Sequence, residues 1–169
     1  RNFAALKRLP GLFSCENNFY SIHSQQLTRQ PASNIVERAR AYSMPAERVE
    51  DSDVLRIHHL VKEAIEEMRA EKSGPRFFEC LTYRWKEHVG PHDDFDKGYR
   101  SISEAEPWFA NDQVKRLAHL LEPRVREEIE AEVEAEIRAA FEFADRSPFP
   151  SEEELYTDVF KEAAPWSAS

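Results

Sequence analysis

Two adjacent asparagines, Asn17 and Asn18, come just after a short apolar run at residues 12–15, with Glu16 between, and could hold a magnesium ion. Asparagine side chains supply neutral carbonyl oxygens, and magnesium takes such hard oxygen ligands together with a carboxylate and phosphate oxygens in near-octahedral geometry. A main-chain carbonyl two residues further on can complete the set. The same pair is also typical of a plain turn, because asparagine is a preferred turn residue. The pair by itself therefore leaves a metal site and a turn both open.

A second polar segment, at residues 84–100, carries an arginine and a histidine that suit phosphate and proton chemistry. Arg84 follows a strongly apolar run, and its guanidinium group matches a phosphate bidentately. His88 comes four residues later, and an imidazole near a phosphate can hydrogen-bond to it or exchange a proton near neutral pH. The alternative is a solvated loop histidine beside an arginine that is held in a salt bridge.

The same segment also contains residue types that bind zinc and other transition metals. These residues are His88, His92, Asp93, Asp94 and Asp96. A metal site here is a weak alternative, because histidines four apart share a face only on a helix, and Val89-Gly90-Pro91 disfavours a helix. No glycine-rich phosphate loop, nucleophile elbow or paired-cysteine motif occurs, which disfavours a self-sufficient nucleotide-binding or hydrolase domain.

The elements that must position these residues are strands separated by helices. Apolar patterns predict strands at 12–15, 48–49 and 76–83. Apolar spacing and capping residues predict helices at 3–8, from Ser33 or Asn34 to 42, and from 51–53 to about 72. Residues 16–18 are expected to form a turn, and residues 21–30 an irregular segment. This order predicts a mostly parallel sheet in a three-layer α/β domain. Such sheets bind ligands at the carboxyl ends of their strands, where Asn18 and Arg84 both fall.

The remainder of the chain is expected to be helical. Helices are predicted near 103–110, at 112–121 and, rich in acidic residues, at 123–146. In the long helix an apolar residue recurs every four positions, as Val125, Ile129, Val133, Ile137 and Phe141. The tail from Ser147 adds Phe149, Leu155, Tyr156, Val159, Phe160 and Trp166. We therefore predict an α/β part at residues 1–100 and a helical part with a tail at 101–169 that packs on a partner.

Composition narrows the classes of partner. The net charge of −9 and the pI of about 5.2 disfavour a surface for nucleic acid or anionic membranes, because phosphate binding needs a positive field. No apolar stretch approaches the ~20 residues that span a bilayer, and no signal-peptide pattern follows Arg1. Cys15 and Cys80 lie in apolar runs, which predicts free thiols and a cytoplasmic location. Because the chain opens inside an expected helix without Met, we expect residue 1 not to be the natural start.

The two polar segments together resemble the alpha subunits of the thiamine-diphosphate-dependent 2-oxo acid dehydrogenases of the pyruvate, branched-chain and acetoin type. The resemblance rests on Glu16-Asn17-Asn18-Phe19-Tyr20-Ser21-Ile22, on Thr82-Tyr83-Arg84 with the histidine loop after it, and on Tyr99-Arg100. It extends to Arg48-Val49-Glu50-Asp51-Ser52-Asp53-Val54, to Gly74-Pro75 and to Glu154-Leu155-Tyr156-Thr157-Asp158-Val159. It covers essentially the whole chain and corresponds to the C-terminal half of such a subunit, with a truncated thiamine-diphosphate-binding fold.

The resemblance implies a magnesium-bound thiamine diphosphate, in which Asn18 binds the metal through its side chain and Tyr20 through its main-chain carbonyl. It places Arg84 and His88 towards the diphosphate and the active-site entrance, with His88 as a proton donor or acceptor, or as an orienting group. The implied reaction is oxidative decarboxylation of a 2-oxo acid with acyl transfer to a lipoyl group, in which the cofactor does the carbanion chemistry. The implied partners are a beta subunit, in an alpha2-beta2 heterotetramer, and a lipoyl-bearing acyltransferase.

The sequence departs from the family pattern in two ways. The Gly-Asp-Gly whose aspartate is the charged magnesium ligand is not in this chain, and the family's activating glutamate comes from the beta subunit, so the chain alone is expected to be inactive. Val89 stands where mitochondrial relatives carry a phosphorylated serine, which excludes kinase control at that position. The loop is similar to that of bacterial relatives and leaves the acyl group open. Two alternatives remain, another thiamine enzyme of the transketolase-like ligase or lyase type and a non-catalytic interaction module.

Overall fold

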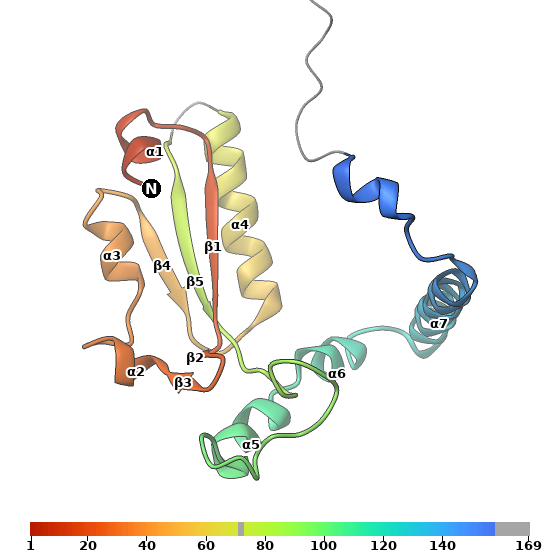
Figure 1. The fold of residues 1–169 in the computed structure, drawn as a ribbon. Helices are drawn as coiled ribbons and strands as arrows, with labels where there is room; N and C mark the ends of the chain where they lie inside the picture. The colour runs from red at the N-terminus through yellow and green to blue at the C-terminus, as the bar shows by residue number, and fades with distance from the viewer. Residues whose placement is uncertain (71–72, 158–169) are drawn as a thin grey trace, which may run out of the picture. The chain divides into compact units, whose positions relative to one another are not determined.

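The computed structural model describes residues 1–70 and 73–157 and contains a small parallel sheet (Figure 1). The sheet contains β1 (Leu12–Asn17), β5 (Arg76–Leu81) and β4 (Ala46–Val49), in the order β1-β5-β4 with both pairings parallel. β5 is the central strand, and a strand that is paired on both sides and covered on both faces is a nearly continuous apolar run. The structure confirms the α/β class and the parallel sheet.

Helices cover both faces of the sheet, so the fold has three layers. The covering helices are α3 (Val36–Arg40) and α4 (Val54–Arg69). On one face Phe77 of β5 packs with Val36 of α3. On the other face Phe78 packs with Ala64 and Met68 of α4. Successive side chains of a strand point to opposite faces, so the alternation within β5 builds two separate apolar clusters. Figure 1 shows α3 and α4 on opposite sides of the sheet.

The long helix α4 begins where the sequence predicts. Asp53 Oδ1 accepts hydrogen bonds from Leu55 N and Arg56 N, at 3.0 and 3.1 Å. An N-cap aspartate of this kind satisfies backbone N–H groups that have no partner inside the helix. The helix ends at Arg69, close to the predicted end at about 72, and residues 71 and 72 lie outside the described part of the chain.

The segment after β1 differs from the prediction. The turn expected at 16–18 starts later, because Glu16 and Asn17 continue β1 and pair with β5. The segment expected to be irregular contains a hairpin of β2 (Tyr20–Ser21) and β3 (Ser24–Gln25), followed by a short helix, α2 (Gln26–Arg29). These elements are too short to show apolar periodicity. Backbone hydrogen bonds hold them instead, such as the bond from Gln26 N to Phe19 O at 2.7 Å.

Several other boundaries move by a few residues. The helix at the N-terminus, α1, spans Asn2–Leu6 rather than 3–8, and α3 ends at Arg40 rather than at residue 42. Strand β4 begins at Ala46 rather than at residue 48, and β5 ends at Leu81 rather than at Tyr83. Ile35 is the N-cap of α3, but Asn34 Oδ1 still accepts a hydrogen bond from Val36 N at 3.1 Å. Hydrogen bonding at the ends, rather than the apolar pattern, decides where an element stops.

By its contacts the chain divides into two units, Arg1–Leu120 and Leu121–Ser169. The first unit contains the sheet together with α5 (Ile102–Ala110) and α6 (Gln113–Ala118), whereas the predicted boundary at residue 100 would separate these helices from it. The second unit contains α7 (Pro123–Arg146) and a short 3-10 helix, η1 (Glu152–Tyr156). The tail residues Val159, Phe160 and Trp166 lie outside the described residues. None of the helices that the structure describes is long and apolar enough to span a bilayer.

Candidate functional site

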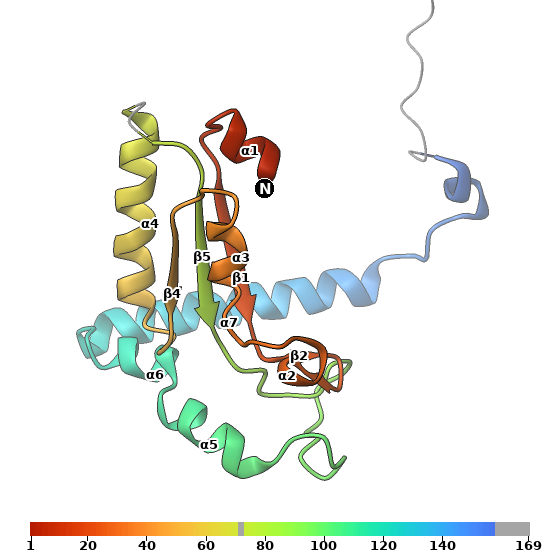
Figure 2. The same ribbon diagram turned by 90° about the vertical axis from the view of Figure 1, so that its left-hand side faces the viewer.

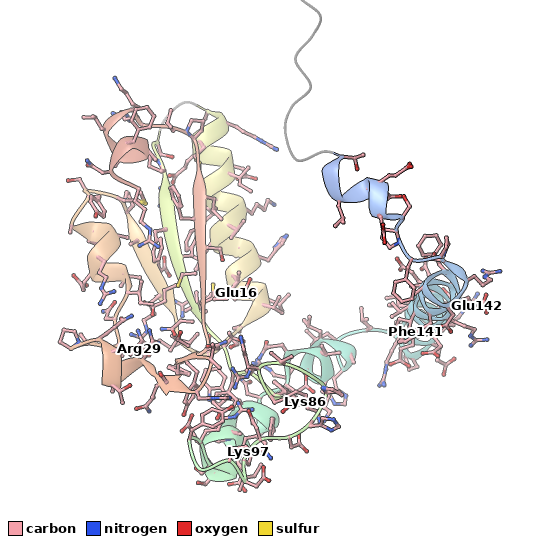
Figure 3. The ribbon with its side chains drawn as sticks, viewed as in Figure 1. Glu16, Arg29, Lys86, Lys97, Phe141 and Glu142 are labelled. Carbon is pink, nitrogen blue, oxygen red and sulfur yellow. The ribbon has the colours of Figure 1, made fainter. Side chains whose placement is uncertain are left out.

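The predicted site residues lie just beyond the carboxyl ends of β1 and β5. The two strands run in the same direction, and Figure 2 shows the hairpin after β1 and the loop after β5 at the same end of the sheet. Thr82 N donates to Asn17 O at 3.0 Å, which joins the two segments where the strand pairing stops. Figure 3 labels Lys86 and Lys97 on the loop. The structure thus brings the segments of Asn18 and Arg84 to one sheet edge, as the sequence predicts.

A carboxylate buried inside the sheet supports this edge. Glu79 of β5 is 0% exposed, and its Oε1 accepts a hydrogen bond from Asn17 Nδ2 at 2.7 Å. Its Oε2 accepts from the main-chain nitrogens of Ile35 and Val36, at 3.0 and 3.2 Å. Asn17 Nδ2 also donates to Oε1 of the buried Gln26 at 3.1 Å. Glu79 therefore fixes the end of β1 against the start of α3. It is absent from the sequence-based predictions.

The asparagine pair forms a tight turn. Asn17 Oδ1 accepts from Phe19 N at 3.0 Å, and Asn18 Oδ1 accepts from Tyr20 N at 3.1 Å. Phe19 takes the left-handed backbone conformation, with φ of 67°. The turn interpretation is therefore correct for the main chain. A metal remains compatible with it, because an amide oxygen has two lone pairs and Asn18 Oδ1 uses one of them for Tyr20.

Two tyrosines and a glutamate join this turn to α5. Tyr20 Oη donates to both oxygens of Glu104, at 2.7 and 2.9 Å, and Tyr83 Oη donates to Glu104 Oε1 at 3.0 Å. Burial, followed by the hydrogen bond to Glu104, raises the pKa of Tyr83 to about 12 and raises the pKa of Tyr20 as well. Both phenols are therefore protonated donors near neutral pH. Glu104, another residue outside the sequence-based predictions, fixes the residue whose carbonyl is the predicted metal ligand.

Arg84 donates to the protein from all three guanidinium nitrogens. Its Nε donates to Lys86 O at 2.9 Å, and its Nη1 donates to Ile22 O at 3.2 Å. Its Nη2 donates to Asp94 Oδ2 at 3.3 Å and to Tyr99 Oη. These bonds tie the hairpin to the loop. They leave a single N–H of the five that a guanidinium group carries. The phosphate contact predicted for Arg84 stays a prediction.

A buried ion pair anchors the loop at residues 84–100. The side chains of Asp94 and Arg100 are 2% and 0% exposed, and Arg100 Nε donates to Asp94 Oδ1 at 2.7 Å. Asp94 Oδ2 accepts from Tyr99 Oη and from Arg84. Burial favours the neutral form of Asp94, but the hydrogen bonds from Tyr99 and Arg100 outweigh burial and hold its pKa below the ordinary value. The loop that the sequence predicts to lie on the surface is therefore held in place by a buried ion pair.

His88 lies in the wall of a surface cavity. The cavity has a volume of about 490 Å³ and is lined by Ile22, His23, Glu87, His88, Val89, Asp94, Lys97 and Tyr99. His88 and Val89 are exposed. The position of His88 allows contact with a ligand that arrives from solvent. Its predicted role in proton transfer stays a prediction.

Metal-binding residue types do not converge elsewhere in the loop. Among the described residues, no group of three or more His, Cys, Asp or Glu side chains could hold a metal ion. His88, His92 and the aspartates near them therefore give no support to the weak zinc alternative. Asp94, one of these candidates, is engaged by Arg84 and Arg100 instead.

The fold and the site define the class of this protein, a three-layer α/β protein whose candidate site follows the carboxyl ends of two neighbouring parallel strands. The sequence model of the dehydrogenase E1 component family matches residues 1–153. The chain belongs to this family.

Curated relatives agree with the family match. The chain is 33% identical to the alpha-3 subunit of the chloroplastic pyruvate dehydrogenase E1 component of Arabidopsis thaliana, over 94% of this chain and 38% of the relative. It is 32% identical to the alpha subunit of the mitochondrial 2-oxoisovalerate dehydrogenase of Homo sapiens, over 95% of this chain and 37% of the relative. It is 32% identical to the alpha subunit of the acetoin:2,6-dichlorophenolindophenol oxidoreductase of Bacillus subtilis, over 94% of this chain and 48% of the relative. The chain thus spans less than half the length of these relatives.

Proposed function

We propose that the chain is part of the alpha subunit of a thiamine-diphosphate-dependent 2-oxo acid dehydrogenase. The observation that carries this proposal is the match of the E1 component family to residues 1–153, with the family's motif residues at one edge of a parallel sheet. The complete enzyme would decarboxylate a 2-oxo acid oxidatively and transfer the acyl group to a lipoyl carrier. The names of the relatives support pyruvate and 2-oxoisovalerate as the 2-oxo acids to test first.

The residues present fit part of a magnesium and cofactor site. Asn18 Oδ1 has a lone pair beyond its bond to Tyr20 N, and the Tyr20 carbonyl would be a second neutral oxygen ligand. A charged ligand would have to come from outside the described residues, so the proposed site is incomplete here. Thiamine diphosphate supplies the carbanion chemistry when it is bound. His88, at an open cavity, can hydrogen-bond to a phosphate or hold a proton near it.

Product analysis of the complete enzyme tests the proposed reaction. The full-length alpha chain is mixed with its beta subunit, thiamine diphosphate and magnesium, and each 2-oxo acid is offered with an artificial electron acceptor. We expect acceptor reduction that depends on a 2-oxo acid. Carbon–carbon bond formation or cleavage without acceptor reduction would instead favour a transketolase-like enzyme. Absence of both activities and of cofactor binding would favour a non-catalytic module.

The replacement Asn18→Ala tests the magnesium site. We expect magnesium-dependent affinity for thiamine diphosphate to fall by about 100-fold in the complete enzyme, since an oxygen ligand is lost. Asn18→Asp is the matched variant, because it keeps an oxygen at the same place and should retain binding. The affinity is measured by isothermal titration calorimetry at fixed magnesium concentration. Equal affinity of the alanine variant and the wild type would contradict the assignment of Asn18.

The long helix α7 offers a surface for the proposed beta subunit. Its apolar residues are between 43% and 67% exposed, namely Val125, Ile129, Val133, Ile137 and Phe141. Residues four apart form a ridge along a helix, and such ridges pack into the grooves of another helix at a crossing angle of about −50°. We propose that a beta-subunit helix covers this ridge in a heterotetramer, and that a lipoyl-bearing acyltransferase binds the assembled enzyme.

Two aspartates placed on the ridge test this packing. The double replacement Val133→Asp and Ile137→Asp should weaken association of the alpha and beta subunits by at least about 10-fold, because it would bury charge in an apolar contact. Glu136→Gln on the same helix is the control and should leave association unchanged. Association is measured by analytical ultracentrifugation. Normal assembly of the double variant would show that another surface joins the subunits.

The cysteines support the predicted cytoplasmic location. Cys15 and Cys80 are free thiols and pack on opposite faces of the sheet. Burial is the main cause that raises the pKa of each thiol, so both are weak nucleophiles. We propose that the protein functions in a reducing compartment such as the cytoplasm.

A further inference from the structure

The cavity that contains His88 also contains a second imidazole, His23. His23 lies in the turn of the β2-β3 hairpin and His88 in the loop after β5, so the two rings reach one cavity of about 490 Å³ from different segments. Both side chains are exposed, and Lys97 adds an ammonium group to the same wall. Imidazolium and ammonium groups donate hydrogen bonds and attract anions.

The hairpin presents His23 in a defined position. Ile22, directly before it, takes a left-handed conformation with φ of 56°, which is uncommon for a β-branched residue. Such a conformation persists where the surroundings hold it, and here Arg84 Nη1 donates to Ile22 O at 3.2 Å. The His23 ring packs against the Tyr99 ring, with the centroids 4.7 Å apart and the rings tilted by 48°. The turn thus fixes the imidazole at the cavity.

The charges around the cavity favour an anionic ligand. Asp94 also lines the cavity, but its negative charge is balanced by ion pairs with Arg84 and Arg100. The other carboxylate of the wall is that of Glu87, and the same wall carries Lys97 and the two imidazoles. A metal ion does not suit this cavity, because no three metal-binding side chains converge among the residues that the structure describes.

We propose that His23 is a second anion-binding residue of the site, and that it acts together with His88 on an anionic group of the reactants. The chemistry fits a carboxylate or a phosphate, so the group is either the carboxylate of the 2-oxo acid or the diphosphate of the cofactor. This inference rests on the proposed function for the identity of the ligand. The anion site itself rests only on the cavity and its residues.

The replacement His23→Asn in the complete alpha-beta assembly tests the proposal in three measurements. These are KM for the 2-oxo acid, the Kd of thiamine diphosphate at fixed magnesium, and the Kd of inorganic pyrophosphate by calorimetry. Loss of a hydrogen bond to a charged ligand group should weaken the affected constant by about 10-fold. A rise in KM alone identifies the carboxylate, whereas a rise in both Kd values identifies the diphosphate. His92→Asn, a histidine of the same loop that is not part of the cavity wall, is the control.

The conservative variant His23→Lys separates binding from a merely structural role. A lysine also carries a positively charged N–H donor, so this variant should restore the affected constant. KM and both Kd values within twofold of wild type in His23→Asn would overturn the proposal, as would a loss that lysine does not restore. An inactive wild-type assembly would count against the proposed function, while pyrophosphate binding would still report on His23.

Discussion

Replacement of Glu79 by alanine is expected to lower the free energy of unfolding by about 3 kcal/mol, since a buried donor left without its acceptor costs about 1–3 kcal/mol and the lost side chain also leaves a cavity. The carboxylate is fully buried and accepts from Asn17 Nδ2 and from the main-chain nitrogens of Ile35 and Val36. Ile35 N would lose its acceptor, whereas Val36 N would keep Asn34 Oδ1 and Asn17 Nδ2 would keep Gln26 Oε1. The loss is measured by urea unfolding of the full-length protein.

The matched control is Glu47→Ala, because Glu47 is also a strand glutamate but its side chain is 43% exposed. Its ion pair with Arg56 at the surface should contribute less than about 1 kcal/mol. Glu79→Gln should fall between the two, since one oxygen remains but the new NH₂ group faces a donor. A loss below about 1 kcal/mol in Glu79→Ala would show that the network around Glu79 does not stabilise the sheet edge.

The replacement Asp94→Asn is expected to destabilise the loop at residues 84–100 by about 3 kcal/mol. It removes a buried negative charge and leaves Arg100, whose side chain is 0% exposed, without its ion-pair partner. The loop carries Lys86 and Lys97, so trypsin should cleave the variant there much faster than the wild type. The control Asp93→Asn changes an exposed ion pair with Lys86 and should leave cleavage unchanged. Equal cleavage of both variants would contradict the anchoring role of Asp94.

The pH dependence of this loop follows from the same residue. Folding lowers the pKa of Asp94 below its ordinary value, because the hydrogen bonds from Tyr99 and Arg100 outweigh burial. The stabilisation is therefore present above the ordinary aspartate pKa and is lost as the pH falls through the lower folded value. The difference in unfolding free energy between the wild type and Asp94→Asn should shrink in strong acid. A difference that is constant over that range would contradict the charge-based explanation.

Most of the fold could be predicted from local patterns. Residues that are close together in the sequence were enough to predict three elements: the apolar strand β5, the capped helix α4 and the strand β1 before the asparagine pair. The hairpin and α2 were not predictable in this way, because they contain few apolar residues and depend on contacts from Gln26 and Arg84. The residues that determine the hairpin and α2 therefore lie in segments that are far apart in the chain.

Some residues of the candidate site could be predicted from the sequence in the same way, and others could not. Residue type and position after a strand were enough to predict that the segments of Asn18 and Arg84 meet at one edge of the sheet, with His88 on the loop that follows Arg84. Glu79 had a visible signal, since a single acid in an apolar strand must find hydrogen-bond donors when it is buried. Glu104 and His23 had no comparable signal, because nothing near them in the sequence indicates that they reach the same end of the sheet.

By itself, then, the sequence determined the α/β class, the parallel sheet, the family and the segments that carry the site, because each depends on patterns within short stretches of chain. Only the tertiary structure decided that Arg84 is bound by Asp94 and Tyr99, that Glu79 holds the end of β1, and that His23 joins His88 in one cavity. These relations are contacts between distant residues. Their geometry arises when the strands pair and bring the loops together.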